Sequence, residues 1–235
     1  DTPHTVVHHG STQGKDELYR NWLALRPSRV IGCTVASPTL AFSATKFFND
    51  HDIPWEWVRS ESVHEAEGFT LTNAYERTGQ LGPDRWYAAI GALSLFRGTP
   101  LLVVHAGTAT TVDSLFQTGD GEYRFMGGRI APGPALMHKA LLSAVPTLDS
   151  GLTEHKDFPL CSSDAITTGI IDAQVGLITQ AYESMCEAGQ RPKIILAGGS
   201  SRFLAPRLRT LHPTLIVRHN LVLGGLAQKV RESKR

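Results

Sequence analysis

The sequence predicts an α/β protein made of two successive units. Helix-like and strand-like patterns alternate up to residue 96, which is typical of α/β units. The segment 97–100 (Arg-Gly-Thr-Pro) then combines glycine with proline and interrupts regular structure. Three consecutive strand patterns, separated by turn residues, follow between residues 101 and 126. We therefore expect a first domain at residues 1–98 and a second domain at residues 99–235.

The first unit reads as helix, strand, helix, strand, loop and helix. Apolar residues recur three or four positions apart in the helical segments, as Leu18, Trp22 and Leu25 do before Pro27. The strand segments are short apolar or alternating runs. The expected helices are 15–25, 39–49 and 85–96, the expected strands are 30–35 and 55–58, and a loop is expected at 60–80.

The second unit reads as a three-stranded meander followed by helices and strands. Gly119-Asp120-Gly121 marks a hairpin tip within the meander. In the longest helical segment, apolar residues recur in steps of three and four until Gly189 and Pro192 end the pattern. The expected strands are 101–104, 109–116, 123–126, 193–197 and 215–217, and the expected helices are 135–145, 164–188 and 225–232.

The composition is that of a folded protein with a sizeable core and no strong charge bias. The chain has 235 residues, of which 41% are hydrophobic and 19% charged, and its formal net charge is +1. This balance gives no strong signal for nucleic acid, and no apolar run approaches the roughly 20 residues of a membrane span. The three cysteines form no CxxC pair. We therefore expect no disulfide framework and a reducing, cytoplasmic setting.

Several common catalytic patterns are absent from the sequence. It contains no P-loop and no GxSxG nucleophile elbow. Despite ten histidines, it has neither HExxH nor a Cys/His spacing suited to zinc. We therefore predict no metal site built from protein side chains.

Four segments place small and polar residues directly against an apolar strand or helix. In the first, Asp84 and Arg85 stand together at a helix start, where Asp84 could also be a simple helix cap. In the second, small residues in a turn let backbone N–H groups approach a phosphate, although an ordinary hairpin has the same pattern. The third reads as a turn that bends into a helix and the fourth as a glycine turn, and either could be purely conformational. The segments are 81–85 (Leu-Gly-Pro-Asp-Arg), 105–112 (His-Ala-Gly-Thr-Ala-Thr-Thr-Val), 127–133 (Gly-Gly-Arg-Ile-Ala-Pro-Gly) and 197–200 (Ala-Gly-Gly-Ser).

In order and spacing, these segments resemble the type III pantothenate kinase family, which includes the Bvg accessory factors. The family's Gly-x-Asp-Arg matches Gly82 to Arg85, and its Gly-Gly-x-Ile-x-Pro-Gly matches 127–133 in full. Its Asp-x-Gly-Thr-Ala-Thr-Thr matches 105–111 except at the first position, where this chain has His105. The resemblance extends from about Val30 to the C-terminus and includes a similar closing segment at 220–226.

The resemblance implies two ribonuclease-H-like domains around a cleft, the fold of the acetate and sugar kinase, heat-shock cognate and actin superfamily. The meander after residue 100 is similar to the start of the second such domain. The first domain lacks its opening strands, which in the family carry an Asp-x-Gly-Asn-Thr/Ser motif that cradles the ATP phosphates and helps hold magnesium. Because a missing first strand would leave the central sheet unpaired, we expect the natural chain to have residues before Asp1.

The resemblance also implies an activity, the ATP-dependent phosphorylation of pantothenate to 4'-phosphopantothenate, the first step of coenzyme A biosynthesis. Asp84 would be the general base, since an ionised carboxylate only accepts hydrogen bonds. Arg85 would hold the anionic pantothenate with its planar fork of donors. Tyr75, Gly82, Pro83 and Ser162 would complete the substrate site, and Gly107 and Thr108 would contact the ATP phosphates.

The implied cofactor is ATP with Mg²⁺, and the implied assembly is a homodimer with the turn at 126–133 near its interface. In the family a monovalent cation, K⁺ or NH₄⁺, is bound by the aspartate that His105 replaces here. A neutral imidazole is a poor ligand for a hard cation that prefers oxygen. We therefore expect a weakened or absent potassium site.

Alternatives stay open at the level of the sequence. A catalytically silent regulatory protein that keeps the kinase fold would account for the missing phosphate motif and for His105, although the intact Gly82–Arg85 motif argues against it. Another phosphotransferase of the same superfamily is a weaker alternative. At single positions, Tyr75 could be an ordinary loop aromatic and Ser162 could be a plain helix N-cap.

Overall fold

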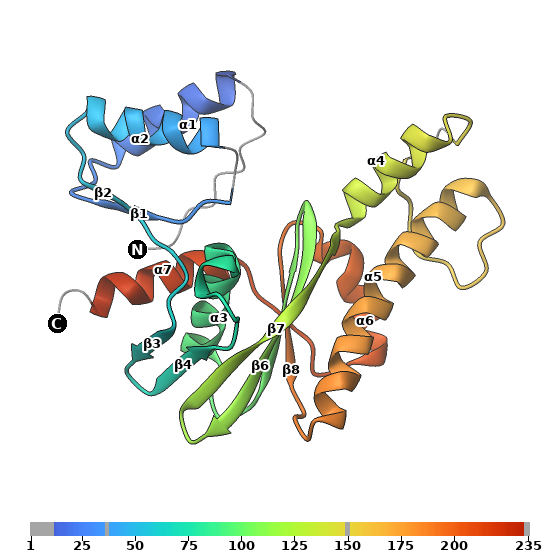
Figure 1. The fold of residues 1–235 in the computed structure, drawn as a ribbon. Coiled ribbons are helices and arrows are strands. Elements are labelled where there is room, and N and C mark those ends of the chain that lie inside the picture. The colour runs from blue at the N-terminus through green and yellow to red at the C-terminus, as the bar shows by residue number, and fades with distance from the viewer. Residues whose placement is uncertain (1–11, 36–37, 149–150, 233–235) are drawn as a thin grey trace.

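The computed structural model describes residues 12–35, 38–148 and 151–232 (Figure 1). Two small parallel strands with two helices form an N-terminal layer, and a seven-stranded mixed sheet with helices on both faces forms the rest. Within the described part, none of the helices combines the length and the apolar character that crossing a bilayer requires.

The N-terminal layer has its own small aromatic core. Phe47 and Phe48 of its second helix are buried, and the Tyr19 ring stacks on Phe47 with 4.2 Å between the ring centroids. The two strands pair in parallel, with Val30 opposite Trp55. The elements are α1 (Thr12–Ala24), β1 (Val30–Gly32), α2 (Pro38–Asp50) and β2 (Trp55–Trp57).

The large sheet has the strand order β3-β4-β7-β6-β5-β8-β9. Strands β5, β6 and β7 form an antiparallel meander, and β8 and β9 continue from β5 in parallel. This is the arrangement of a ribonuclease-H-like domain, so the expected α/β fold class is confirmed. The strands are β3 (Val63–Ala66), β4 (Phe69–Asn73), β5 (Leu101–Ala106), β6 (Ala109–Gly119), β7 (Glu122–Pro132), β8 (Lys193–Ala197) and β9 (Ile216–Val217).

Helices cover both faces of this sheet, and the sheet separates the apolar core into two halves (Figure 1). α3 and α7 pack on one face, together with Leu101 and Val103 of β5. α5 and α6 pack on the other face, with Leu102 and Val104 of the same strand. The alternation along β5 is the two-residue period of a strand that is buried on both sides. The helices are α3 (Pro83–Leu95), α4 (Pro134–Ala144), α5 (Ser162–Glu187), α6 (Ser201–Leu211) and α7 (Leu221–Glu232), with a 3₁₀ turn η1 (Thr78–Gln80).

α3 and α7 cross at an unusually short distance because each contributes a glycine to the contact. A Cβ atom on Gly225 would lie 2.8 Å from the carbonyl carbon of Tyr87, and one on Gly91 would lie 2.9 Å from the amide nitrogen of Gly225. Both distances are far below ordinary van der Waals contact, so only glycine permits this crossing. α3 is consequently buried along most of its length.

The sequence-based prediction of the elements is wrong in three places. Residues 60–80 do not form one loop, since they contain the β3–β4 hairpin and η1. Residues 127–132 are not a turn, because β7 continues through them with a β-bulge opposite Ser114. α6 was not predicted, because Pro206 inside it and its three arginines obscure the helical pattern. The other predicted helices and strands are all found, β8 with the predicted ends and the rest with shifted ends.

The β3–β4 hairpin joins the sheet from the other side of the predicted domain boundary. β4 pairs in parallel with β7, and Asn73 lies opposite Phe125. α3, which also precedes residue 98, packs mainly on α7 from the end of the chain. The division into one domain at residues 1–98 and another at 99–235 therefore stays a proposal. The large sheet contains strands from both segments.

Candidate active site

The first turn of α3 holds the Gly82–Arg85 motif. Gly82 is the N-cap residue, and Pro83 occupies the first helical position, where its missing N–H costs nothing. Asp84 is half-buried, whereas Arg85 points into the protein and is only 6% exposed. The alternative in which Asp84 caps the helix is wrong, since the N-cap is Gly82 and no side chain caps this end.

Arg85 is held in place by two side chains from different elements. Its Nε and Nη2 atoms donate to one oxygen, Oδ1 of Asp113 on β6, over 2.9 and 2.5 Å. Its Nη1 atom donates to the hydroxyl of Tyr75 over 2.9 Å. The ring of Tyr75 in turn contacts Phe125 on β7 edge-on, with 6.0 Å between the ring centroids. The structure thus brings together two of the predicted substrate residues, Tyr75 and Arg85, and adds Asp113 to them.

Asp113 is a buried carboxylate, 1% exposed. Its pKa is raised to about 6. Burial is the main cause and the negative charge of Asp84 adds to it, whereas the hydrogen bonds from Arg85 and Thr111 oppose the rise. Asp84 acts in the same way on Cys33, the residue after β1, whose pKa is raised to about 11 chiefly by burial. The carboxylate of Asp84 therefore lies between the large sheet and the N-terminal layer.

Two of the predicted glycine motifs and the turn after β5 meet at one end of that strand. The Gly133 amide donates to Thr108 O over 2.8 Å, and the Ser200 amide donates to Ala106 O over 3.0 Å. Gly198, with a φ of 94°, comes so close to Ala106 that a Cβ atom there would lie 2.6 Å from its carbonyl carbon. Segments 105–112, 127–133 and 197–200 are therefore neighbours in space.

This end of β5 fits a bound phosphate chain. Thr108 is exposed at the turn, and nothing lies within 4 Å of the position where Gly199 would carry a Cβ atom. Across the described parts of the chain, the backbone amides of Thr108 and Gly199 have no backbone acceptor. Backbone N–H groups that converge on open space at a glycine turn are the usual donors for phosphate oxygens.

His105 is the next-to-last residue of β5 and pairs with Thr111 of β6 and Ala197 of β8. Its side chain retains solvent contact, yet the surrounding protein desolvates it and lowers its pKa, which the charge of Asp84 partly offsets. The imidazole is therefore neutral at neutral pH. It lies beside Gly107, between the predicted phosphate turn and Asp84.

A family model described as type III pantothenate kinase matches residues 4–184, more than half of the chain. The chain belongs to the type III pantothenate kinase family. A type III pantothenate kinase from Polaromonas is 35% identical over 207 residues, which cover 86% of this chain and 77% of that protein. One from Methylobacillus flagellatus is 38% identical over 214 residues, covering 90% and 84%.

A solved structure shows that the fold is shared as well. The crystal structure of a Baf family transcriptional activator from Campylobacter jejuni superposes with a TM-score of 0.59 and 20% sequence identity. The match covers 92% of this chain and 88% of the other. At this identity the likeness supports the common architecture of this type III pantothenate kinase family member and nothing more specific.

Ser162 is the predicted substrate residue that the chain does not bring to Asp84. It is exposed at the first residue of α5, which packs on the opposite face of the sheet from α3 (Figure 1). The N-cap of α5 is Cys161, so the alternative in which Ser162 is the cap is wrong.

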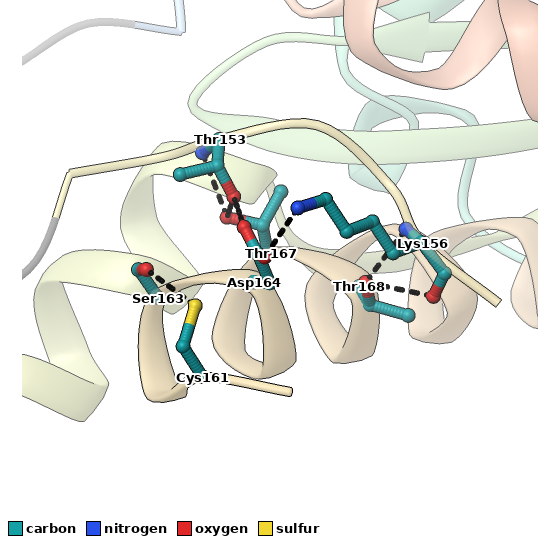
Figure 2. A network of polar contacts seen from close by, with 7 residues as sticks. All are labelled: Thr153, Lys156, Cys161, Ser163, Asp164, Thr167 and Thr168. Carbon is teal, nitrogen blue, oxygen red and sulfur yellow. Dashed lines mark hydrogen bonds and ion pairs between the residues drawn. The ribbon is translucent and has the colours of Figure 1, made fainter. Parts of the chain in front are cut away.

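A network of side-chain hydrogen bonds nevertheless fixes the start of α5 (Figure 2). Asp164 accepts hydrogen bonds from the Thr153 hydroxyl over 2.9 Å and from Lys156 Nζ over 2.6 Å. Thr167 and Thr168 accept the amides of Thr153 and Lys156 over 2.9 and 3.1 Å. These contacts tie the segment before α5 to its first turns and fix the backbone that presents Ser162.

Asp113 and the reason for glycine at position 128 were not predicted from the sequence. A Cβ atom on Gly128 would lie 2.5 Å from Arg85 Nη2 and 2.7 Å from Val112 O, so the strand needs glycine where it passes the ion pair. The available signal was a single Asp inside the apolar strand pattern 109–116, since aspartate is rarely buried without a partner.

We expect Asp113 to make this protein less stable as the pH rises from about 4 to about 6. Its ordinary pKa is 3.8 and its folded-state pKa is about 6, so between these values the folded chain binds a proton that the unfolded chain has released. The free energy of unfolding then falls with rising pH, by about 3 kcal/mol for two units. Urea unfolding from pH 4 to 7 of the natural protein and of Asp113→Asn checks this. Identical pH slopes for the two proteins would contradict it.

Proposed function

We propose that this protein transfers the γ-phosphoryl group of ATP to the primary hydroxyl of pantothenate, forming 4'-phosphopantothenate as the first step of coenzyme A biosynthesis. The observation that carries this proposal is the Gly82–Arg85 motif at the start of α3, beside the turn at 105–109. Membership of the type III pantothenate kinase family supports the substrate and the reaction.

Asp84 is the proposed general base. It lies in the first turn of α3, where the helix dipole favours a negative charge, and its half-buried carboxylate can accept the proton of a hydroxyl brought to it. In phosphoryl transfer most of the protein's contribution is positioning and charge neutralisation. Gly82 leaves the space beside the carboxylate open for the alcohol, since a Cβ atom there would lie 2.5 Å from Asp84 Oδ1, and Pro83 fixes the start of the helix.

Arg85 and Tyr75 are proposed to hold the carboxylate of pantothenate. A guanidinium has five N–H donors, and three of those of Arg85 are engaged with Asp113 and Tyr75. Among the described residues, the second N–H on Nη1 and the second N–H on Nη2 have no partner. These two donors match the spacing of a carboxylate, which favours bidentate binding of the substrate anion.

The backbone at Gly107, Thr108 and Gly199 is proposed to bind the ATP phosphates. Mg²⁺ would neutralise phosphate charge when bound and would enter with the nucleotide. The three cysteines are free thiols, which supports the proposed cytoplasmic location.

A homodimer is the proposed assembly. Large apolar side chains are exposed along the end of β7, along α4 and in the segment that follows α4. A surface of this kind is normally covered by another protein chain. A second copy would also explain how Ser162, across the sheet from Asp84, could contact substrate. The exposed residues are Met126, Ile130, Leu136, Leu141, Val145, Phe158 and Leu160.

We expect the activity to show little dependence on potassium. The neutral imidazole of His105 offers a hard cation neither an oxygen ligand nor a negative charge. The rate at fixed ionic strength should stay level when Na⁺ is exchanged for K⁺. The variant His105→Asp should gain a rate increase with K⁺. A steep response of the natural protein to K⁺ would contradict the prediction.

The test of the proposed function is pantothenate-dependent ATP consumption by the full-length chain, with 4'-phosphopantothenate identified as the product. ATP consumption that responds to another alcohol and not to pantothenate would indicate a different phosphotransferase. Binding of pantothenate and ATP without turnover would indicate a silent regulatory protein.

A further inference from the structure

The Arg85–Asp113 ion pair fixes the orientation of the Arg85 guanidinium. A single oxygen of Asp113 accepts both Nε and Nη2, which fixes one edge of the planar group. Thr111, two residues earlier on the same face of β6, donates a hydrogen bond to the Asp113 carboxylate. Tyr75 fixes Nη1 from the opposite direction. The remaining N–H groups on Nη1 and Nη2 then point in a defined direction.

The neighbouring strand is shaped to accommodate this pair. Gly127 has a φ of 131°, which favours glycine, and a β-bulge in the pairing of β6 with β7 lies at this point. Gly128 then passes so close to the pair that any side chain would displace Asp113 or Arg85. Two consecutive glycines in the middle of a strand weaken it, so their presence needs a reason other than the sheet.

Stability does not supply that reason. A buried ion pair is often no more stabilising than apolar side chains of the same volume, because both charges lose their hydration. Here burial outweighs the attraction of Arg85, since the pKa of Asp113 is raised and not lowered. The carboxylate is itself 1% exposed and covered by Arg85, so it cannot touch a substrate.

We propose that Asp113 is a positioning residue for the substrate carboxylate, which it controls by aiming the two remaining N–H groups of Arg85. The proposal rests on the proposed function, since the anion it concerns is pantothenate. It concerns substrate binding and not the phosphoryl transfer, and it predicts an effect that is specific to one of the two substrates.

The central experiment compares the natural protein with Asp113→Asn, which has the same shape and lacks the charge. We expect the KM for pantothenate to rise about 10- to 100-fold, the range for losing charge-assisted hydrogen bonds. The KM for ATP and kcat should stay within about threefold, because neither depends on the aim of Arg85. Asp120→Asn, the same substitution at the exposed hairpin tip, is the control and should change neither KM.

A second measurement does not depend on activity. The Nε–H of Arg85 should give a protected side-chain NMR signal in the natural protein, and Asp113→Asn should lose that protection, while Asp120→Asn should keep it. An unchanged pantothenate KM, or an equal loss with both substrates that follows a lower melting temperature, would overturn the proposal and leave the proposed function standing. A natural protein that neither binds nor phosphorylates pantothenate would overturn the proposed function, and this proposal with it.

If Asp113→Asn does not fold, the proposal is tested with the natural protein at different pH values. The titratable and polar groups that act on Asp113 are Arg85 and Asp84 from α3 and Thr111 from its own strand, and β7 passes the carboxylate at Gly128. Protonation of Asp113 below a pKa of about 6 weakens its hold on Arg85. The KM for pantothenate should therefore rise on acidification below pH 6 while the KM for ATP does not. A pantothenate KM that stays constant from pH 7 to 5 would overturn the proposal.

Discussion

Replacing Asp84 with asparagine is expected to lower the rate of pantothenate phosphorylation by more than about 100-fold, the contribution of a typical general base. The amide has the same shape but cannot take a proton, so the substrate hydroxyl keeps its hydrogen as the phosphoryl group arrives. The fold should be unchanged, because Asp84 caps nothing and lies half-exposed in the first turn of α3. Initial rates at saturating ATP and pantothenate measure the effect.

Asp157→Asn is the matched control, since the Asp157 carboxylate is 72% exposed and lies 3.9 Å from Arg207, away from α3. Its rate should equal that of the natural protein. The affinity for pantothenate should survive in Asp84→Asn, because the two remaining N–H groups of Arg85 are untouched. Near-normal turnover by Asp84→Asn would remove Asp84 from the role of base.

The second large effect is expected on stability, from Gly225→Ala. The new methyl group would lie 2.8 Å from the carbonyl carbon and 3.1 Å from the Cα atom of Tyr87, both of which are backbone atoms of α3 and cannot rotate away. α7 must then shift from α3, which opens the core on that face of the sheet. We expect a loss of about 3 kcal/mol in the free energy of unfolding, the upper part of the range for overpacking. Urea unfolding measures it.

Gly176→Ala is the control for this substitution. Gly176 lies in the middle of α5, is exposed, and has nothing within 4 Å of the position of a new Cβ atom. Alanine should therefore stabilise the helix there by up to about 1 kcal/mol, its ordinary advantage over glycine. Equal effects of the two variants would mean that the α3–α7 crossing tolerates a wider spacing.

Most helices and strands could be predicted because their apolar periodicity agrees with their local environment. The β3–β4 hairpin could not, because its alternation is inverted at its first strand, where His64 is buried and Val63 is exposed. Its stability comes from pairing with β7, about 50 residues later in the chain. The path of β7 through Gly127 and Gly128 was obscured in the same way, since paired glycines ordinarily indicate a turn.

The motif residues of the candidate site could be predicted from the sequence, but the residue that supports Arg85 could not. Asp84, Arg85 and the turn at Gly107 stand in short segments whose residue types suggest their chemistry. Asp113 belongs to an ordinary strand, and only the fold shows that it lies under Arg85. Ser162 shows the reverse case, because the resemblance implied a substrate contact for it, whereas within one chain α5 packs on the opposite face of the sheet from α3.

The packing of α3 on α7 also determines when the protein can fold. α3 is the element that contributes the largest share of one half of the core, yet its main partner is α7, which lies far along the chain. On the ribosome, α3 and the hairpin before it emerge before β7 and α7 exist, so their apolar faces stay uncovered until α7 has been synthesised. This half of the molecule therefore completes its core only after α7 has emerged from the ribosome.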